Sequence, residues 1–234
     1  MRIAGVYCQA RRRALLEIER LFFYCTGMSP KSVIQATLFG NEEPSFDSTL
    51  TSLRRRALPY ASWIDQAQGF LAGHQPIFDL IHDDTRWHSH NRVMYDRTID
   101  VPRLTASLPR DGPGHSAIRE IADALGERYD RPFDLVTLAL YRNGSDSIAW
   151  HRDKCREDRR GQATIATLSL GESRSFLVRP HGGGTSVRFS AGWGDLLVMG
   201  GACQLYWEHS IPKTRAAGPR ISVMFRSTAD FLVS

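Results

Sequence analysis

The chain has 234 residues, of which 42% are hydrophobic, 10% aromatic and 24% charged, with a formal net charge of +5. This is the composition of one globular domain with a short appendage, and it excludes a disordered or collagen-like chain. No apolar run approaches the roughly 20 residues that a membrane helix needs, so we expect no membrane partner. The four cysteines are widely spaced and form no CxxC pair, which favours the cytoplasm over secretion.

The basic side chains are unevenly distributed. Residues 1–60 hold nine basic and five acidic residues, whereas residues 61–234 hold 21 and 20. An arginine-rich basic protein suggests a nucleic-acid partner, but only where the charges gather locally. We therefore expect phosphate contacts from two groups of residues: Arg92 and Arg97, and the run Arg152, Lys154, Arg156, Arg159 and Arg160.

The first half of the chain is predicted to be helical behind a tail. Residues 1–45 include a stretch rich in Ser, Thr, Pro, Gly and Asn, which is typical of a poorly ordered tail. The apolar spacing over residues 62–82 fits two short amphipathic helices separated by Pro76. A further helix is predicted over residues 115–129, HSAIREIADALGERY.

The pattern changes after Pro132, where eight short runs with alternating apolar residues are separated by turn signals such as Asn143-Gly144. Evenly spaced short strands predict an antiparallel sandwich or jelly roll, so the fold class is α+β and mainly β, with N-terminal helices. The runs cover residues 134–141, 147–151, 163–171, 174–180, 185–192, 195–201, 204–209 and 220–226.

One candidate metal site begins at His151-Arg152-Asp153. In an extended chain, residues i and i+2 point to the same face, so the imidazole and the carboxylate project together. Such a pair is more often an ordinary hydrogen-bonded pair, and a metal site needs a third ligand. His209, at the end of its predicted strand, is one candidate; His181, in a glycine-rich turn, is its rival. Two histidines and a carboxylate form the facial triad of non-haem Fe(II) oxygenases.

A candidate anion site lies in the run Arg220-Ile-Ser-Val-Met-Phe-Arg226. The separation of six places both guanidinium groups on one face of a strand, about 20 Å apart at the backbone. Arginine binds carboxylates bidentately, so the pair could hold a dicarboxylate; the alternative is two exposed arginines on an edge strand. Tyr141 shares a face with Thr137 and Ala139, and its hydroxyl could reach the same carboxylate.

The order Tyr141, His151-x-Asp153, His209 and Arg220-x5-Arg226 resembles the AlkB-like Fe(II)/2-oxoglutarate dioxygenases, which reverse alkylation damage in nucleic acids. The runs LALYRNGSDSIAWHRD, GDLLVMGG and WEHSIPK agree with this resemblance. It implies a domain over residues 46–234, with a helical and lid part over 46–131 and a double-stranded β-helix, or jelly-roll, core over 132–228.

The resemblance also implies roles for individual residues. His151, Asp153 and His209 would hold Fe(II), and no separate acid or base would be needed. Arg220 would pair with the distal carboxylate of 2-oxoglutarate, helped by Tyr141, with Arg226 nearer the chelating end. The segment MYDRTIDVPR resembles a substrate lid. The residues expected to bind substrate are Trp87, Arg92, Met94, Tyr95 and Arg97.

The implied reaction is oxidative dealkylation of N-alkylated bases, coupled to conversion of 2-oxoglutarate and O2 to succinate and carbon dioxide, with release of an aldehyde. The expected partner is alkylated DNA or RNA, bound by a monomer. Two alternatives stay open: a dioxygenase of the same machinery that acts on a protein or small molecule, and a non-catalytic metal-binding jelly roll.

Two positions depart from the family pattern. Ala139 stands where some members have an asparagine that contacts 2-oxoglutarate. Lys154 and Cys155 follow the metal-binding motif, where many members carry an acidic residue that contacts the damaged base. We expect the iron chemistry to survive both changes and the base preference to differ.

Overall fold

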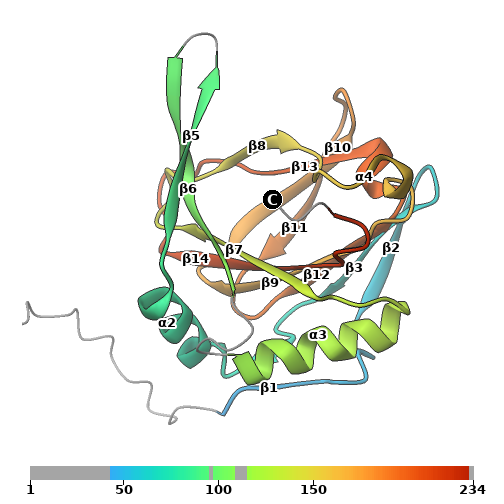
Figure 1. Ribbon diagram of the computed structural model, residues 1–234, viewed down its shortest axis with the longest axis horizontal. Helices are drawn as coiled ribbons and strands as arrows, with labels where there is room; N and C mark the ends of the chain where they lie inside the picture. Colours follow the sequence, from blue (N-terminus) through green and yellow to red (C-terminus); the bar gives the residue numbers. More distant parts are fainter. Residues whose placement is uncertain (1–42, 95–96, 109–114, 232–234) are drawn as a thin grey trace, which may run out of the picture. The chain divides into compact units, whose positions relative to one another are not determined.

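Two antiparallel sheets enclose the interior of the domain in the computed structural model, which describes residues 43–94, 97–108 and 115–231 (Figure 1). The predicted tail over 1–45 lies outside these residues except for its last three. Residues 41–234 form one compact unit. The two-sheet arrangement is that of a jelly roll.

The larger sheet has eight strands and contains the centre of the core. Its fourth strand, β9, is buried along its whole length, because one of its faces packs in the helix-covered core and the other faces the interior between the sheets. In sheet order the strands are β2 Arg54–Leu58, β3 Ser62–Ala67, β12 Leu196–Gly201, β9 Ile165–Gly171, β14 Arg220–Arg226, β7 Leu135–Tyr141, β6 Arg97–Ser107 and β5 His88–Met94.

The smaller sheet has four strands and covers the inner face of the larger one. Its strands are, in order, β11 Val187–Ala191, β10 Arg174–Pro180, β13 Trp207–Ile211 and β8 Ile148–His151. A two-stranded sheet pairs β1 Ser45–Phe46 with β4 Leu71–Ala72. The helices are α2 His74–Asp84, α3 His115–Tyr129, α4 Cys203–Tyr206 and the single 3-10 turn η1 Glu157–Arg159.

Alternation along the strands separates the helix-facing core from the interior between the sheets. On β14, Ile221, Val223 and Phe225 belong to the buried cluster that also holds the apolar faces of α2 and α3. The alternate residues of this strand face the other way, because successive side chains of a strand point to opposite faces. The same strand therefore builds the core with one face and the site with the other.

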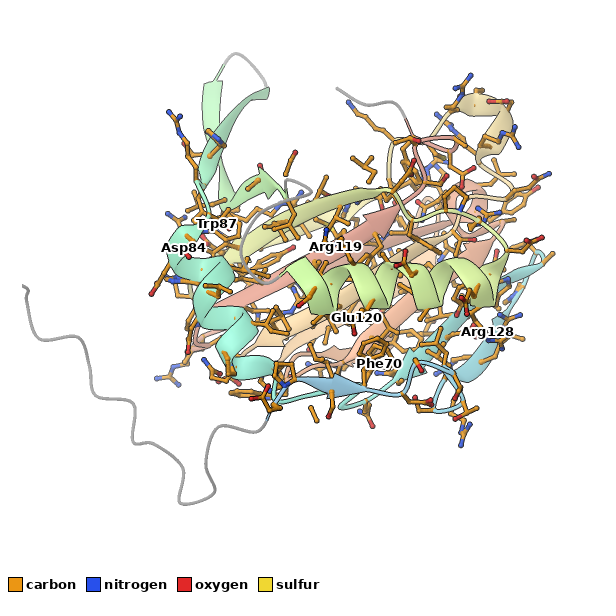
Figure 2. All side chains as sticks on the ribbon, turned by 60° about the horizontal axis from the view of Figure 1, so that its bottom comes forward. Phe70, Asp84, Trp87, Arg119, Glu120 and Arg128 are labelled. Carbon is orange, nitrogen blue, oxygen red and sulfur yellow. The ribbon has the colours of Figure 1, made fainter. Side chains whose placement is uncertain are left out.

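Helices α2 and α3 cover the outer face of the larger sheet (Figure 2). Ile118, Ile121 and Leu125 of α3 are buried, whereas Glu120 and Arg128 are exposed. This spacing of three to four residues is the amphipathic pattern that predicted the helix, and α3 has the predicted bounds.

Two predictions about the first half of the chain were wrong: the two helices over residues 62–82, and Pro76 as the break between them, since Pro76 lies in the first turn of α2. Residues 62–82 do not form two helices: Ser62–Ala67 is strand β3, and only His74–Asp84 is helical. Strand β3 forms a hairpin with the preceding β2 and pairs on its other side with the distant β12, and these backbone hydrogen bonds override a spacing that also fits a helix. The part over 46–131 is therefore as much strand as helix.

A third correction concerns the strand predicted over residues 204–209. Cys203–Tyr206 forms the short helix α4, and the strand runs from Trp207 to Ile211. His209 consequently lies in the middle of β13 rather than at its end. No helix among the described residues is long and apolar enough to cross a membrane.

Candidate metal centre and cosubstrate cavity

Sheet pairing brings the three predicted metal ligands together. His209 of β13 lies directly opposite His151 of β8 in the antiparallel ladder, and Asp153 follows β8 by two residues. The potential ligand atoms of these three side chains all lie within 4.8 Å of one another. The His209 Nε2 atom is 3.6 Å from the Asp153 Oδ2 atom. The rival His181 is half exposed beyond the end of β10 and near Glu208, outside this group.

The protonation states of the group suit a divalent metal. Burial lowers the pKa of His209 to about 3, so its imidazole is neutral at pH 7. Burial opposes ionisation of Asp153, but Arg226 and the two histidines together hold the pKa of this carboxyl well below its usual range. A neutral imidazole and an ionised carboxylate are the forms that bind a metal ion.

Hydrogen bonds to the surrounding chain orient the ligands. His151 Nδ1 lies 2.9 Å from the Ala149 carbonyl oxygen and donates to it, which leaves Nε2 as the nitrogen with a free lone pair. Arg226 donates from Nη2 to Asp153 Oδ1 at 2.9 Å and from Nη1 to Thr137 Oγ1 at 2.6 Å. The Gln204 side chain accepts from the Asp153 amide at 2.9 Å. These contacts orient the metal-ligating side chains of His151 and Asp153 in the absence of a metal.

A cavity of about 410 Å³ opens beside the triad, between the two sheets. Its wall includes Tyr141 and Arg226, as predicted for cosubstrate contacts, and Ser222 and Met224 from the same face of β14 as Arg226. The remaining wall is mainly apolar and hydroxyl-bearing, with Ile148, Ile165, Phe176, Met199, Ile211, Leu138, Ala106, Thr105, Ser107, Thr137 and Thr167, together with His88 and Arg103.

Arg220 is a fully buried cation behind this wall. Its guanidinium donates to the Ala191 carbonyl oxygen at 2.8 Å and to the hydroxyls of Ser222 and Ser169, each at 2.7 Å. Burial lowers its pKa to about 10, which leaves it charged at pH 7. Because all these acceptors are neutral, a carboxylate entering the cavity beside Ser222 would compensate the charge. The donor set therefore fits a dicarboxylate cosubstrate, and the triad fits Fe(II).

The two departures from the family pattern lie in different places. Ala139 is buried between the sheets and pairs with Ser222 of β14, so a serine hydroxyl stands beside the position of the missing amide. Cys155 is buried against the C-terminal segment, where it forms an isolated bridge with Phe231. Cys155 does not line the cavity.

Of the predicted substrate residues, only Trp87 has a described side chain. Its indole donates to the His82 carbonyl oxygen at 3.0 Å and packs against the core cluster, outside the cavity wall (Figure 2). The side chains of Arg92, Met94 and Arg97, and all of Tyr95, lie outside the described residues. The predicted lid segment forms the hairpin of β5 and β6 that rises from the edge of the larger sheet (Figure 1).

Acidic neighbours neutralise much of the predicted basic run. Arg156 and Arg159 lie 3.9 and 3.6 Å from the Asp158 carboxylate. Arg160 lies 2.9 Å from the Glu157 carboxylate. Arg152 donates to the Leu205 carbonyl oxygen at 3.0 Å, and Lys154 is exposed. Within this run, Arg152 and Lys154 are thus the residues that form no ion pair with another described residue, and they flank Asp153.

Arg103 was missed by sequence reasoning. It belongs to β6, where the neighbouring Leu104 pairs with Leu140 of β7, so Arg103 lies opposite Tyr141 and lines the cavity. No local spacing marks this arginine as functional. Only the pairing of β6 with β7 brings it to the cavity.

Comparison with known proteins agrees with this geometry. The model of the 2OG-Fe(II) oxygenase superfamily matches residues 79–226. The chain is 29% identical to the human alpha-ketoglutarate-dependent dioxygenase alkB homolog 3, over 64% of this chain and 60% of that protein. It is 31% identical to the DNA oxidative demethylase ALKBH2 of Arabidopsis thaliana, over 79% of this chain and 72% of that protein.

The fold is also that of solved relatives. The structure of OsALKBH1 superposes with a TM-score of 0.51 at 13% identity, covering 74% of this chain and all of that one. The match supports the jelly-roll assignment alone. The chain spans 60% of the length of the human alkB homolog 3 protein that it matches.

Proposed function

The chain belongs to the 2OG-Fe(II) oxygenase superfamily, and from this premise we propose that it removes alkyl groups from the ring nitrogens of nucleic-acid bases. The overall reaction consumes O2 and 2-oxoglutarate. One oxygen atom enters succinate as carbon dioxide leaves, and the other enters the alkyl C–H bond. The hydroxylated N-alkyl group then breaks its C–N bond, which releases an aldehyde and leaves the bonding electron pair on the base nitrogen. The hydroxyl proton passes to this nitrogen where the alkyl group had replaced a proton, and to solvent where it had used a lone pair.

A single arrangement carries this proposal: a triad of His151, Asp153 and His209 at one cavity, with the buried cation Arg220, hydrogen-bonded to neutral acceptors, behind its wall. Bound at the triad, Fe(II) would supply the oxidising chemistry with O2 and 2-oxoglutarate. The chain's own residues do the positioning. Arg226 holds Asp153, Arg220 and Tyr141 receive the distal carboxylate, and apolar residues such as Phe176 exclude water.

The choice of nucleic acid as the substrate rests on two kinds of support. The matched relatives are named as a DNA oxidative demethylase and as alkB homologues. The cavity is open and large enough to receive a base swung out of the stack, which is how enzymes reach such atoms. We propose alkylated DNA as the first substrate to test and RNA as the second, a catalytic domain over residues 46–234, and a cytoplasmic monomer.

The deciding experiment measures aldehyde and succinate release from methylated and etheno-adducted DNA and RNA oligonucleotides, with Fe(II) and 2-oxoglutarate. We expect repair by the unaltered protein and none by Asp153→Ala, which removes a ligand. Asp158→Ala, an exposed aspartate outside the cavity, is the matched control and should retain repair.

Two outcomes would contradict the proposal. Succinate release without repair of any oligonucleotide would point to a dioxygenase of proteins or small molecules. Tight metal binding without any 2-oxoglutarate turnover would point to a non-catalytic jelly roll. A third outcome, succinate release that persists in Asp153→Ala, would instead overturn the assignment of Asp153 as a metal ligand.

A further inference from the structure

Arg103 is a cation in the cavity whose hydrogen bonds are incomplete. Its Nε atom is buried and has no hydrogen-bond partner. Its Nη1 atom lies 3.5 Å from the Tyr141 hydroxyl, at the outer limit for a hydrogen bond. A buried donor without an acceptor costs free energy, so this position favours a ligand that brings an acceptor.

The charges around the cavity indicate which kind of ligand Arg103 favours. Among the residues that line the cavity, Asp153 is the only carboxylate, and it already pairs with Arg226 at 2.9 Å. With the metal and cosubstrate bound, the two charges of Fe(II) balance those of dianionic 2-oxoglutarate. In the cavity wall, Arg103 and Arg226 then face one carboxylate, whereas the charge of Arg220 behind the wall is partly compensated by Asp195. The space left for a base therefore has a positive potential.

Arg103 also lies close to the metal group. Arg103 lines the same cavity as His151, Asp153 and His209. A base whose alkyl carbon reaches the metal must therefore pass within range of this guanidinium. Cys155, buried against Phe231, offers no compensating negative charge.

N-alkylated bases fall into two electrostatic classes. Methylation of adenine N1 or cytosine N3 uses a ring lone pair, so these bases carry a positive charge at neutral pH. Methylation of guanine N1 or thymine N3 replaces a proton, so these bases stay neutral. Like 3-methylcytosine, and unlike 1-methyladenine, they carry a carbonyl oxygen beside the methylated nitrogen. Carbonyl oxygens are the acceptors that an arginine reads on a base edge.

We propose, on the basis of the proposed dealkylase function, that Arg103 is a specificity-determining residue that favours neutral, carbonyl-bearing lesions over cationic ones. A carbonyl oxygen accepts from the unpartnered Nε atom of the guanidinium and completes its hydrogen bonds. A cationic base meets a like charge in a partly desolvated site, which is unfavourable.

The test uses four oligonucleotides of one sequence, each with a single 1-methyladenine, 3-methylcytosine, 1-methylguanine or 3-methylthymine. We compare kcat/KM for the neutral and cationic pairs, together with binding affinity measured without O2 by fluorescence anisotropy. The unaltered protein should favour the neutral pair. Arg103→Met should lower the neutral-to-cationic ratio at least about tenfold, in binding as in turnover. Arg103→Lys, which keeps the charge, should retain discrimination against the cationic pair.

Arg188→Met is the matched control, because Arg188 is an exposed arginine of β11 that bonds Ser175 and does not line the cavity. The neutral-to-cationic ratio of Arg188→Met should equal that of the unaltered protein. The inference is overturned if the unaltered protein prefers cationic lesions, or if folded Arg103→Met keeps the original ratio and only raises the KM for 2-oxoglutarate. Aldehyde release from no oligonucleotide would instead contradict the dealkylase function itself.

Discussion

At the residue scale, the most informative side chain is Arg220, a buried cation whose observed partners are two hydroxyls and a backbone carbonyl oxygen. Burying a guanidinium without a hydrogen-bonded anion costs several kcal/mol, and the nearby Asp195 carboxylate compensates part of the charge. Strand β14 pairs with β7 on one side and with β9 on the other. These backbone hydrogen bonds hold Arg220 in its buried position despite this cost. The position is therefore prepared for a carboxylate that the protein itself does not supply.

We predict that Arg220→Met raises the KM for 2-oxoglutarate at least tenfold. A hydrogen bond to a charged group contributes about 1.5–3 kcal/mol, which corresponds to a factor of roughly 10 to 100. The measurement is succinate release in the absence of any substrate, with circular dichroism to verify folding. Arg220→Lys keeps the cation, so its KM for 2-oxoglutarate should lie between those of the unaltered protein and Arg220→Met. An unchanged KM in folded Arg220→Met would remove Arg220 from the cosubstrate site.

At the scale of elements, Asp65 of β3 joins two neighbouring elements to the sheet. It is 2% exposed and accepts a bidentate pair of hydrogen bonds from Arg55 of β2, both at 2.8 Å. It also accepts from the Tyr129 hydroxyl at the end of α3, at 2.8 Å. The Tyr129 ring stacks on Trp63 of the same strand. This contact fixes the C-terminal end of α3 against the sheet.

The Tyr129 contact predicts a loss of stability at high pH. Burial, with the neighbouring Asp65 carboxylate, raises the pKa of Tyr129 above its usual value of 10. The unfolded chain therefore releases this proton first, so the stabilisation is complete below about pH 10 and falls as the pH rises further. Tyr129→Phe should lose about 1–3 kcal/mol at pH 8, because the acceptor is charged.

Urea unfolding at pH 8 and above pH 10 tests this prediction. The unaltered protein should lose more stability between the two pH values than Tyr129→Phe does. Tyr206→Phe, at an exposed tyrosine, is the matched control and should behave like the unaltered protein. Equal pH dependence in Tyr129→Phe and the unaltered protein would contradict the role of this phenol.

At the scale of the whole molecule, the net charge of +5 says little about where a polyanion binds. Three of the five basic residues near the metal group lie beside Asp158 or Glu157. Arg152 and Lys154, on either side of Asp153, are the candidates that form no ion pair with another described residue. Phosphate contacts beside the cavity should therefore depend on these two residues rather than on the total charge.

We predict that replacing Arg152 and Lys154 together by glutamine weakens nucleic-acid binding and flattens its salt dependence. Each lost phosphate contact should lower the slope of log K against log salt by about 0.7–0.9. Fluorescence anisotropy without O2, over a range of salt concentrations, measures this slope. Arg160→Gln is the control, because Arg160 already pairs with Glu157. A larger effect from the control than from the double variant would contradict the assignment.

The sequence by itself determined the local patterns of this protein. Strand β14, strand β10 and helix α3 have the predicted bounds, because alternation and helical spacing depend on neighbouring residues only. The pairing of His151 with Asp153 follows from the same two-residue period, and the structure brings His209 beside them.

Tertiary structure decided what depends on pairing between distant segments. Ser62–Ala67 became a strand because β2 and β12 supply its hydrogen bonds. His209 rather than His181 joined the metal group because β13 lies beside β8. Arg103 entered the cavity because β6 pairs with β7. Such contacts join residues far apart in the chain, so no local spacing encodes them, and they determine which charges meet in the cavity.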